Sequence, residues 1–250
     1  MVDKSYLDGF QYDEQGNVVG FRDYAITSWA DCPIHGRYAK TYGDELSQWE
    51  IKCGCPSCFK NQMIEEQLKS AMIPPRFLTK TLDNFETAEE WQRKASAIIR
   101  SYVSDFDSVL SQGRCLILCG LPGTGKTHLA CAYANEVIKQ GHSASFTSVS
   151  KIIRTVRASW GTGTEEDVLQ TFSNVDLLVI DEVGVQAGTE NEKQILFNIL
   201  NERYNFMRPT VLISNLKQVE MKTALGERVW DRLKENGGKL INLTGDSFRK

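Results

Sequence analysis

A phosphate-binding loop is the feature that most constrains what this chain can fold into. The segment Gly120-Leu-Pro-Gly-Thr-Gly-Lys-Thr127 matches G-x-x-x-x-G-K-T, and it stands between an apolar run at 115–119 and a helix-forming run at 128–135. Glycines in such a loop let backbone N–H groups surround phosphates, and the following helix adds the positive end of its dipole. A glycine-rich turn with a solvated lysine is the alternative. The coincidence of strand, loop and helix favours a nucleoside triphosphate site.

Each polar side chain of this loop has an expected role in binding ATP. Lys126 is expected to reach the β- and γ-phosphates, and Thr127 to offer its hydroxyl to Mg²⁺. The residues predicted to bind the nucleotide are Gly120, Pro122, Gly123, Thr124, Gly125, Lys126, Thr127, His128 and Asp181.

Two carboxylates, Asp181 and Glu182, end the apolar run 176–180. A strand buried on both faces that delivers acids at its carboxyl end suits a Mg²⁺–nucleotide site in a parallel sheet. Asp181 is expected to bind the Mg²⁺ shell with Thr127, and Glu182 to orient and activate the attacking water. Without the upstream loop, the pair would be only the end of a strand.

Five strands alternate with helices, which predicts an α/β fold with a parallel five-stranded sheet. The predicted strands are 115–119, 143–149, 176–181, 209–215 and 238–244. The predicted helices after the phosphate loop are 151–159, 192–207 and 227–233, and a longer one, with a capping box at 87–90, precedes the loop and extends to about 112.

A domain boundary is expected near the dipeptide Pro74-Pro75, which stops an amphipathic helix at 60–72. Residues 1–72 then form a small N-terminal domain with its connecting helix, and residues 73–250 form the nucleotide-binding domain. Just beyond the boundary, Arg76, Phe77 and Phe85 either form an apolar wall for adenine or simply pack against the helix that follows.

Composition restricts the possible partners. The chain has 250 residues, a net charge of −3 and a pI near 5.7, so any contact with nucleic acid must be local. It has no run of eighteen apolar residues, and its N-terminus lacks the basic and apolar regions of a signal peptide. We therefore expect a cytoplasmic protein without a membrane partner.

Two close pairs of metal-ligand residues lie in the first quarter of the chain. Cys32-Pro-Ile-His35 and Cys55-Pro-Ser-Cys58 have the spacing that places four ligands around a tetrahedral Zn²⁺. Cys53 competes with Cys55, but a Cys53/Cys58 pair would leave four residues between ligands, which favours Cys55. The alternative is a cluster of reduced thiols beside a solvent-facing histidine. A closed four-ligand site would make the zinc structural.

The remaining cysteines and the N-terminal segment have plainer interpretations. Cys115, Cys119 and Cys131 flank the phosphate loop and are expected to be buried small hydrophobes. Residues 1–31 carry six acidic against two basic side chains, and 9–12 and 18–21 flank a turn-rich segment that predicts a hairpin.

Four segments together resemble DnaC-type replicative helicase loaders, a branch of the AAA+ ATPases. They are 123–130, 173–186, 226–233 and 246–249, and the resemblance extends over about residues 70–250. It implies an AAA+ core without the usual helical lid, ATP hydrolysis, self-association through AAA+ interfaces, and binding of single-stranded DNA and a hexameric DnaB-type helicase. The N-terminal part differs, because it is helical in DnaC-type loaders. Here it is more similar to the metal-bearing front of Gram-positive or phage-encoded loaders.

The resemblance also implies roles for three residues beyond the phosphate loop and the acidic pair. Asn215 ends the predicted strand 209–215 and is expected to hydrogen-bond the γ-phosphate or the attacking water; the alternative is an asparagine in a strand-to-loop turn. By the resemblance, Asn215 is similar to the sensor that reads the γ-phosphate, Arg232 to the arginine finger offered to a neighbouring subunit, and Arg249 to the second sensor. Arg228 lies on the same helix face as Arg232 and is the alternative finger. For the arginines, surface ion pairs are the competing interpretation.

A second group of residues resembles the part of initiator-type AAA+ proteins that contacts single-stranded DNA. It comprises Trp160 and Arg157, and in a separate loop Thr189 and Asn191. An indole beside arginines can stack on a base while the guanidinium contacts phosphate. The alternative is a core tryptophan on an amphipathic helix.

These observations predict an ATP-dependent loader of the replicative helicase onto single-stranded DNA during replication initiation, with residues 1–72 binding the helicase. A transposition helper of the IstB type shares the core, but it would bind duplex DNA and a transposase and is not expected to carry zinc. A nucleotide-locked adaptor, which binds ATP but scarcely hydrolyses it, is a rival of another class.

Overall fold

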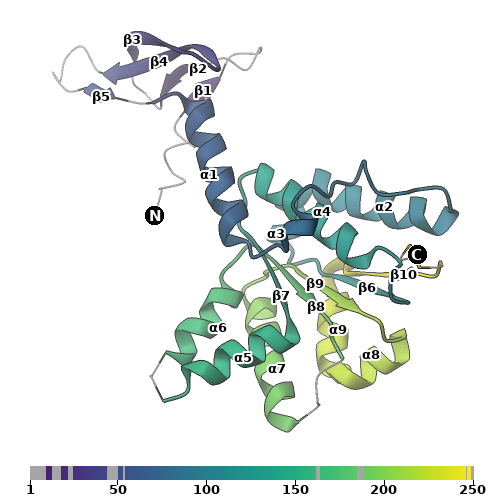
Figure 1. Cartoon of the computed structure of the whole chain (residues 1–250). Coiled ribbons are helices and arrows are strands. Elements are labelled where there is room, and N and C mark those ends of the chain that lie inside the picture. The colour runs from purple at the N-terminus through teal and green to yellow at the C-terminus, as the bar shows by residue number, and fades with distance from the viewer. Residues whose placement is uncertain are drawn as a thin grey trace. The chain divides into compact units, whose positions relative to one another are not determined.

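The computed structural model describes residues 10–12, 18–21, 25–43, 50–52, 54–161, 164–184, 189–245 and 247–248 (Figure 1). The chain divides into two compact units, Met1–Glu66 and Gln67–Lys250, and helix α1 (Pro56–Ser70) runs across the division. Cys53 and Arg249, which the sequence analysis singled out, lie outside the described residues.

The N-terminal unit is built from short antiparallel strands. β1 (Phe10–Tyr12) pairs with β2 (Val18–Phe21), which confirms the predicted pairing. A second, three-stranded sheet has the order β3-β4-β5, with β3 at Ala25–Cys32, β4 at Gly36–Gly43 and β5 at Glu50–Lys52. The β3–β4 turn consists of residues 33–35. Cys32 at the end of β3 and His35 in this turn together form one of the two predicted pairs of zinc ligands.

The C-terminal unit contains a five-stranded sheet with the order β10-β6-β9-β8-β7, in which every neighbouring pair is parallel. Its strands are β6 (Leu116–Gly120), β7 (Ala144–Ser148), β8 (Leu177–Asp181), β9 (Thr210–Ser214) and β10 (Lys239–Leu243). The predicted α/β fold with a parallel five-stranded sheet is confirmed. The strand that ends at the phosphate loop, β6, has neighbours on both sides, and the strand that ends at Asp181, β8, is separated from it only by the central strand β9.

Helices cover both faces of this sheet (Figure 1). Their bounds are α2 (Glu90–Ser104), α3 (Phe106–Ser111), α4 (Lys126–Lys139), α5 (Val149–Ser159), α6 (Glu165–Ser173), α7 (Glu190–Asn205), α8 (Gln218–Leu225) and α9 (Glu227–Lys234), with single 3₁₀ turns η2 (Pro75–Phe77) and η3 (Glu235–Gly237). One face packs on α4 and α2, and the other on α5, α7 and α9. Among the described residues, no helix combines the length and the apolar content needed to cross a bilayer.

The predicted long helix before the phosphate loop is wrong in two details. Its capping box is formed by Glu89 and Gln92, whose Oε1 accepts from the Glu89 N–H at 2.7 Å, rather than by Thr87 and Glu90. The helix also breaks at Asp105, whose φ of −125° and ψ of 39° are not helical, so two helices replace one. Helices α6 and α8 and the sheet of β3, β4 and β5 were not predicted.

A buried arginine of α7 forms hydrogen bonds that link this helix to α6 and to the starts of two strands of the sheet. Arg203 of α7 is 1% exposed, and burial lowers the pKa of its guanidinium to about 9, which still leaves it charged at neutral pH. Its three nitrogens donate to the Thr210 hydroxyl at 2.9 Å and to backbone carbonyls around the starts of β8 and β9. The carbonyl acceptors are those of Phe172, Ser173, Val175, Asp176 and Pro209.

We expect Arg203→Met to destabilise the protein by about 3–5 kcal/mol, because it leaves several buried carbonyl groups without a donor. Urea unfolding followed by circular dichroism measures this loss. The control is Arg100→Met, which removes an exposed ion pair with Asp83 and should cost less than about 1 kcal/mol. Equal losses for the two variants would contradict the role assigned to Arg203.

Candidate nucleotide site and metal centre

The carboxyl ends of three adjacent strands converge on one cavity of about 440 Å³. Parallel pairing brings Gly120 at the end of β6, Asp181 at the end of β8, and Asn215 just after β9 to the same edge of the sheet. The cavity is lined by Arg76, Phe77, Lys80, Asn84, Phe85, Glu86, Pro122, Gly123, Gly125, Lys126, Thr127, His128, Asp181, Glu182, Asn215 and Phe248. It therefore collects most of the side chains predicted to bind ATP.

The two side chains expected to share Mg²⁺ are in contact. The Thr127 hydroxyl donates to Asp181 Oδ2 at 3.0 Å, and the backbone N–H of Glu182 donates to Asp181 Oδ1 at 2.7 Å. One carboxylate oxygen thus faces the phosphate loop while the other is held by the chain that follows β8. Hydroxyl and carboxylate oxygens are hard ligands that suit Mg²⁺, so this donor set fits the ion.

Lys126 is held inside the phosphate loop. Its side chain is 5% exposed, and its Nζ donates to the carbonyl oxygens of Gly120 and Leu121, each at 2.7 Å. These bonds fix the ammonium group under the loop that is expected to carry the phosphates. A bound triphosphate would offer this charge anionic oxygens in a poorly solvated place, where the attraction is stronger than in water.

Glu182 has an uncommon backbone conformation. Its φ is +61°, a left-handed value that costs a residue with a side chain about 1–2 kcal/mol. The residue lines the cavity next to Asp181. This conformation turns the chain at the end of β8, at the second residue of the acid pair. An attacking water would have to be positioned beside this turn.

Two glycines of the phosphate loop accommodate neighbours from distant parts of the chain. Gly123 has a φ of +84°, a Cβ added there would collide with Ser247, and its carbonyl accepts from the Phe248 N–H at 2.9 Å. Gly125 has a φ of +87°, and its added Cβ would meet the Phe85 ring at 2.7 Å. These glycines therefore allow both the loop conformation and the close approach of the two segments.

The residues proposed as an adenine wall do line the cavity. Phe85 packs edge-on against His128 with ring centroids 5.3 Å apart, and the His128 Nε2 lies 3.0 Å from the Thr81 carbonyl. Burial lowers the pKa of His128, so its ring is neutral at pH 7 and donates to that carbonyl. Sequence reasoning missed Lys80, Asn84, Glu86 and Phe248. Tertiary packing brings them to the cavity. Lys80, Asn84 and Glu86 belong to no motif, and Phe248 lies in segment 246–249, which was noted only for its resemblance to helicase loaders.

The two candidate finger arginines lie away from this cavity. The Arg232 guanidinium contacts the Asn201 side-chain oxygen and lies 4.6 Å from the centroid of the Tyr204 ring. Arg228, the alternative, is exposed on the same helix. A finger acts on a neighbouring subunit's nucleotide, so a site elsewhere on the surface is what the role requires, and the role stays a prediction.

The predicted DNA-contacting residues lie at the C-terminus of α5 and the N-terminus of α7. Arg157 forms an ion pair of 3.0 Å with the buried Glu192, and the Thr189 hydroxyl caps α7 by accepting from the Glu192 N–H at 3.3 Å. Asn191 is exposed in the first turn of α7. Trp160 is 45% exposed, so the alternative of a core tryptophan is wrong.

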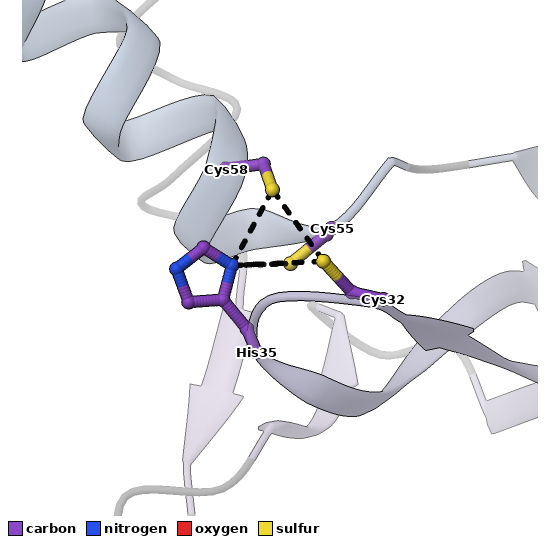
Figure 2. A group of neighbouring side chains, drawn as sticks. All are labelled: Cys32, His35, Cys55 and Cys58. Carbon is purple, nitrogen blue, oxygen red and sulfur yellow. Dashed lines mark hydrogen bonds between the residues drawn. The ribbon is translucent and has the colours of Figure 1, made fainter.

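The four predicted zinc ligands converge in the N-terminal unit (Figure 2). The His35 Nδ1 lies 3.6 Å from Cys32 Sγ, 3.6 Å from Cys55 Sγ and 3.3 Å from Cys58 Sγ, and the sulfurs of Cys32 and Cys58 are 3.5 Å apart. Tetrahedral zinc with ordinary bond lengths would place sulfurs about 3.8 Å apart and nitrogen about 3.5 Å from each sulfur. The cluster fits such an ion and could bind zinc.

The surroundings of the cluster suit a metal-bound histidine and thiolates. The other ring nitrogen of His35, Nε2, lies 3.5 Å from Nδ2 of Asn61. A ring that binds metal through Nδ1 carries its proton on Nε2, so the Asn61 amide has to turn its oxygen toward the ring to accept this proton. Backbone N–H groups of Ile34 and His35 lower the pKa of Cys32 to about 6, whereas hydrogen bonding to Cys32 raises the pKa of Cys58 to about 11. The pocket thus already stabilises one thiolate.

The cysteines near the phosphate loop are buried, as predicted. Burial raises the pKa of Cys119 to about 11 and that of Cys131 to about 12, and it also raises the pKa of Cys115. All three are therefore neutral thiols at pH 7 and contribute to packing rather than to chemistry.

Fold and site together define an ATPase of the AAA+ class. The parallel sheet has a phosphate loop after one interior strand, an acid pair after another, and an asparagine after the central strand between them. The chain belongs to the family of IstB-like ATP binding proteins, whose model matches residues 60–250. The sequence-based prediction of an AAA+ ATPase of the DnaC-like group is confirmed.

Several known proteins are similar to this chain. The replicative helicase loader DnaC of Escherichia coli (strain K12) is 33% identical over 228 residues, which cover 87% of this chain and 91% of that protein. The crystal structure of the DnaC helicase loader matches 68% of this chain and 99% of its own, with a TM-score of 0.61 and 26% identity. The replication initiator DnaA bound to AMPPCP and single-stranded DNA matches 70% of this chain and 52% of its own, with a TM-score of 0.60 and 26% identity.

We predict that the purified full chain contains about one zinc per molecule, as a closed Cys₃His site requires. Mass spectrometry of metals measures the content, and a chelator should lower the melting temperature. Cys58→Ser should lose the metal, whereas Cys53→Ser should retain it and so serves as the matched control. A stably folded wild-type protein without metal would contradict the assignment. Loss of the metal in the single variant Cys53→Ser would identify Cys53, in place of Cys55, as the ligand.

Proposed function

We propose that this protein is an ATP-dependent loader of a hexameric DnaB-type replicative helicase onto single-stranded DNA during replication initiation, acting in the cytoplasm. The observation that carries the proposal is the similarity to the helicase loader DnaC, which extends over 87% of this chain and 91% of that protein, together with a family model that matches residues 60–250 and so includes the nucleotide site. Similarity restricted to the phosphate loop would support only nucleotide binding.

ATP binding and hydrolysis are assigned to residues that line the cavity. The phosphate loop binds the triphosphate with Lys126 at its centre, and Mg²⁺ is held by Thr127 and Asp181, whose side chains are 3.0 Å apart. Glu182 activates the attacking water and Asn215 reads the γ-phosphate from the neighbouring strand end. Electrostatic stabilisation by these fixed groups is the main source of catalysis in phosphoryl transfer.

Self-association would complete the site. Arg232, or alternatively Arg228, supplies a guanidinium to the nucleotide of a neighbouring subunit, and Arg249 acts as a second sensor. A charge delivered across a subunit boundary stabilises the transition state only in the assembled oligomer, and it therefore couples hydrolysis to assembly. The partly buried stacking of Arg232 on Tyr204 supports a guanidinium held in a defined orientation.

Single-stranded DNA is proposed to contact the ends of α5 and α7. The exposed indole of Trp160 offers a stacking surface, and Arg157, Thr189 and Asn191 offer polar contacts to the backbone. The ion pair between Arg157 and Glu192 supports this grouping, because it joins the two helix ends.

The N-terminal domain, residues 1–72, is proposed to bind the helicase. Its described core is small, and a structural zinc at Cys32, His35, Cys55 and Cys58 would stabilise a unit of this size. The exposed Ile34 sits in the turn between the first two ligands, so metal binding would also fix the conformation of that surface.

Two rival functions remain distinguishable. The family model is that of IstB-like proteins, which is consistent with a transposition helper that binds duplex DNA and a transposase. Co-purification with helicase rather than transposase favours the loader. A nucleotide-locked adaptor would bind ATP without turnover, and this is tested by measuring hydrolysis in the presence of both helicase and DNA.

The variant Glu182→Gln tests the loading mechanism. It removes the base that activates water and leaves the phosphate-binding groups intact, so we expect ATP affinity to stay near wild type while turnover falls by about 10²-fold or more. Complexes of the protein, its host's helicase and single-stranded DNA should then accumulate with ATP, as seen by electron microscopy.

Lys126→Ala is the matched control, because it should abolish nucleotide binding itself. Wild-type ATP affinity in Lys126→Ala would contradict the phosphate-loop assignment. A wild-type protein that hydrolyses no ATP with helicase and DNA present would contradict the loader and favour the adaptor.

The variant Trp160→Ala tests the DNA contact. If the indole stacks on a base, affinity for a labelled single strand should fall by about 1–3 kcal/mol with little change in thermal stability. Phe206→Ala, which removes an exposed ring at the opposite end of α7, is the control and should bind normally. Unchanged DNA affinity in Trp160→Ala would remove the indole from the proposed surface.

A further inference from the structure

A buried amide on α4 organises the segment that lines one part of the nucleotide cavity. Asn135 is 2% exposed, and its Nδ2 lies 3.1 Å from the carbonyl oxygen of Phe77, 3.3 Å from that of Leu78 and 3.0 Å from that of Lys80. Only the amide nitrogen can face three acceptors, so the orientation of this side chain is determined by its surroundings. Three backbone carbonyl groups of one segment therefore surround a single NH₂ group.

The segment around Phe77 needs this donor because its own hydrogen bonds pair only one of the three carbonyl groups. The N–H groups of Phe77 and Leu78 donate to Pro74 and Pro75, and the Lys80 N–H donates to the Phe77 carbonyl at 3.1 Å, which leaves the carbonyls of Leu78 and Lys80 without a donor from the segment itself. Buried carbonyl groups are nearly always paired in folded proteins, and an unpaired one is costly. Asn135 supplies the missing donor from a different element.

The other side of the same segment lines the cavity. Arg76, Phe77 and Lys80 all contribute to the lining, and the Arg76 guanidinium lies 4.9 Å from the centroid of the Phe77 ring. The phosphate loop and the acid pair account for the triphosphate, which leaves this aromatic and cationic surface for the base and the ribose. Flat π-systems of this kind stack favourably on nucleobases.

Helix α4 therefore connects the two parts of the cavity. Its first turn carries Lys126 and Thr127, and Asn135 follows nine residues after Lys126, about 13 Å along the helix. Between them, His128 reaches the Thr81 carbonyl at 3.0 Å and gives the segment a second attachment to the same helix. A rigid helix thus sets the distance between the phosphate groups and the segment that includes Phe77.

We propose that Asn135 is a positioning residue for nucleotide binding: it holds residues 77–80 in the conformation that receives the base, without touching the nucleotide. The inference rests on one part of the proposed function, which is that the cavity binds ATP. Asn135 belongs to no motif, and the inference gives it a contribution to the affinity for the base that is separate from the binding of the phosphates.

The test is Asn135→Leu, which keeps the size of the side chain and removes its donors. We expect the Kd and KM for ATP to rise about tenfold, the effect of losing one well-placed buried hydrogen-bonding group, while kcat at saturating ATP stays within about twofold. Hydrogen exchange at the backbone amides of Leu78 and Lys80 should accelerate more than exchange in the sheet.

Tyr133→Phe is the matched control on the same helix. Its hydroxyl is buried and has no hydrogen-bond partner among the described residues, so its removal should change neither ATP affinity nor exchange at 78–80. If Asn135→Leu lowers only the melting temperature and binds ATP like wild type, the inference is overturned and Asn135 is merely structural.

A second comparison separates this inference from the proposed function. Lys126→Ala should lose ATP binding altogether, because it removes the central phosphate contact. If wild type binds ATP and Lys126→Ala does not, but Asn135→Leu retains wild-type affinity, then only the positioning role fails. If the wild-type protein binds no ATP, the proposed function is contradicted. Faster hydrogen exchange at Leu78 and Lys80 in Asn135→Leu would then not be enough to support the positioning role.

Discussion

The parallel register of three strands determines where all the nucleotide chemistry can occur. Because β9 pairs with β6 on one side and β8 on the other, the ends of these strands lie at one edge of the sheet. The hydrogen bond between Thr127 and Asp181 crosses this edge and is the direct physical link between the phosphate loop and the acid pair. A shift of register by one residue would turn these side chains toward the opposite face of the sheet and dismantle the site.

The phosphate loop is constrained from outside as well as from within. Gly123 and Gly125 need positive φ values for the loop itself, yet each also lies directly beneath a side chain from elsewhere, Ser247 and Phe85. The loop, the segment before α2 and the segment after β10 therefore support one another. In a chain with no helical lid after β10 among its described residues, this packing provides part of the enclosure around the cavity.

Elements that a local sequence pattern specifies could be predicted, whereas features that depend on contacts between distant parts of the chain could not. The sheet strands were predictable, since their residues are buried on both faces and read as continuous apolar runs. The break at Asp105 was not, because the amphipathic pattern continues through it. Lys80 lies in the segment that Asn135 contacts, and Asn84 lies in the turn that follows and bonds to Thr79 and Thr81; no motif marks either residue. The Cys/His cluster was predicted from spacing alone, whereas the position of Asn61 beside His35 depends on the fold.

The acid pair and α7 are joined by a short covalent connection, which links the nucleotide site to the surface proposed to contact DNA. Glu182 and the capping residue Thr189 are separated by only six residues, and Thr189 caps the helix that carries Glu192. Glu192 in turn pairs with Arg157, so this ion pair joins the end of α5 to the start of α7. The buried position of Glu192 makes this coupling stiff, since separating the pair would leave a carboxylate without its charged partner in a poorly solvated place. A signal from the acid pair that shifted the start of α7 would therefore act on the end of α5 through this ion pair.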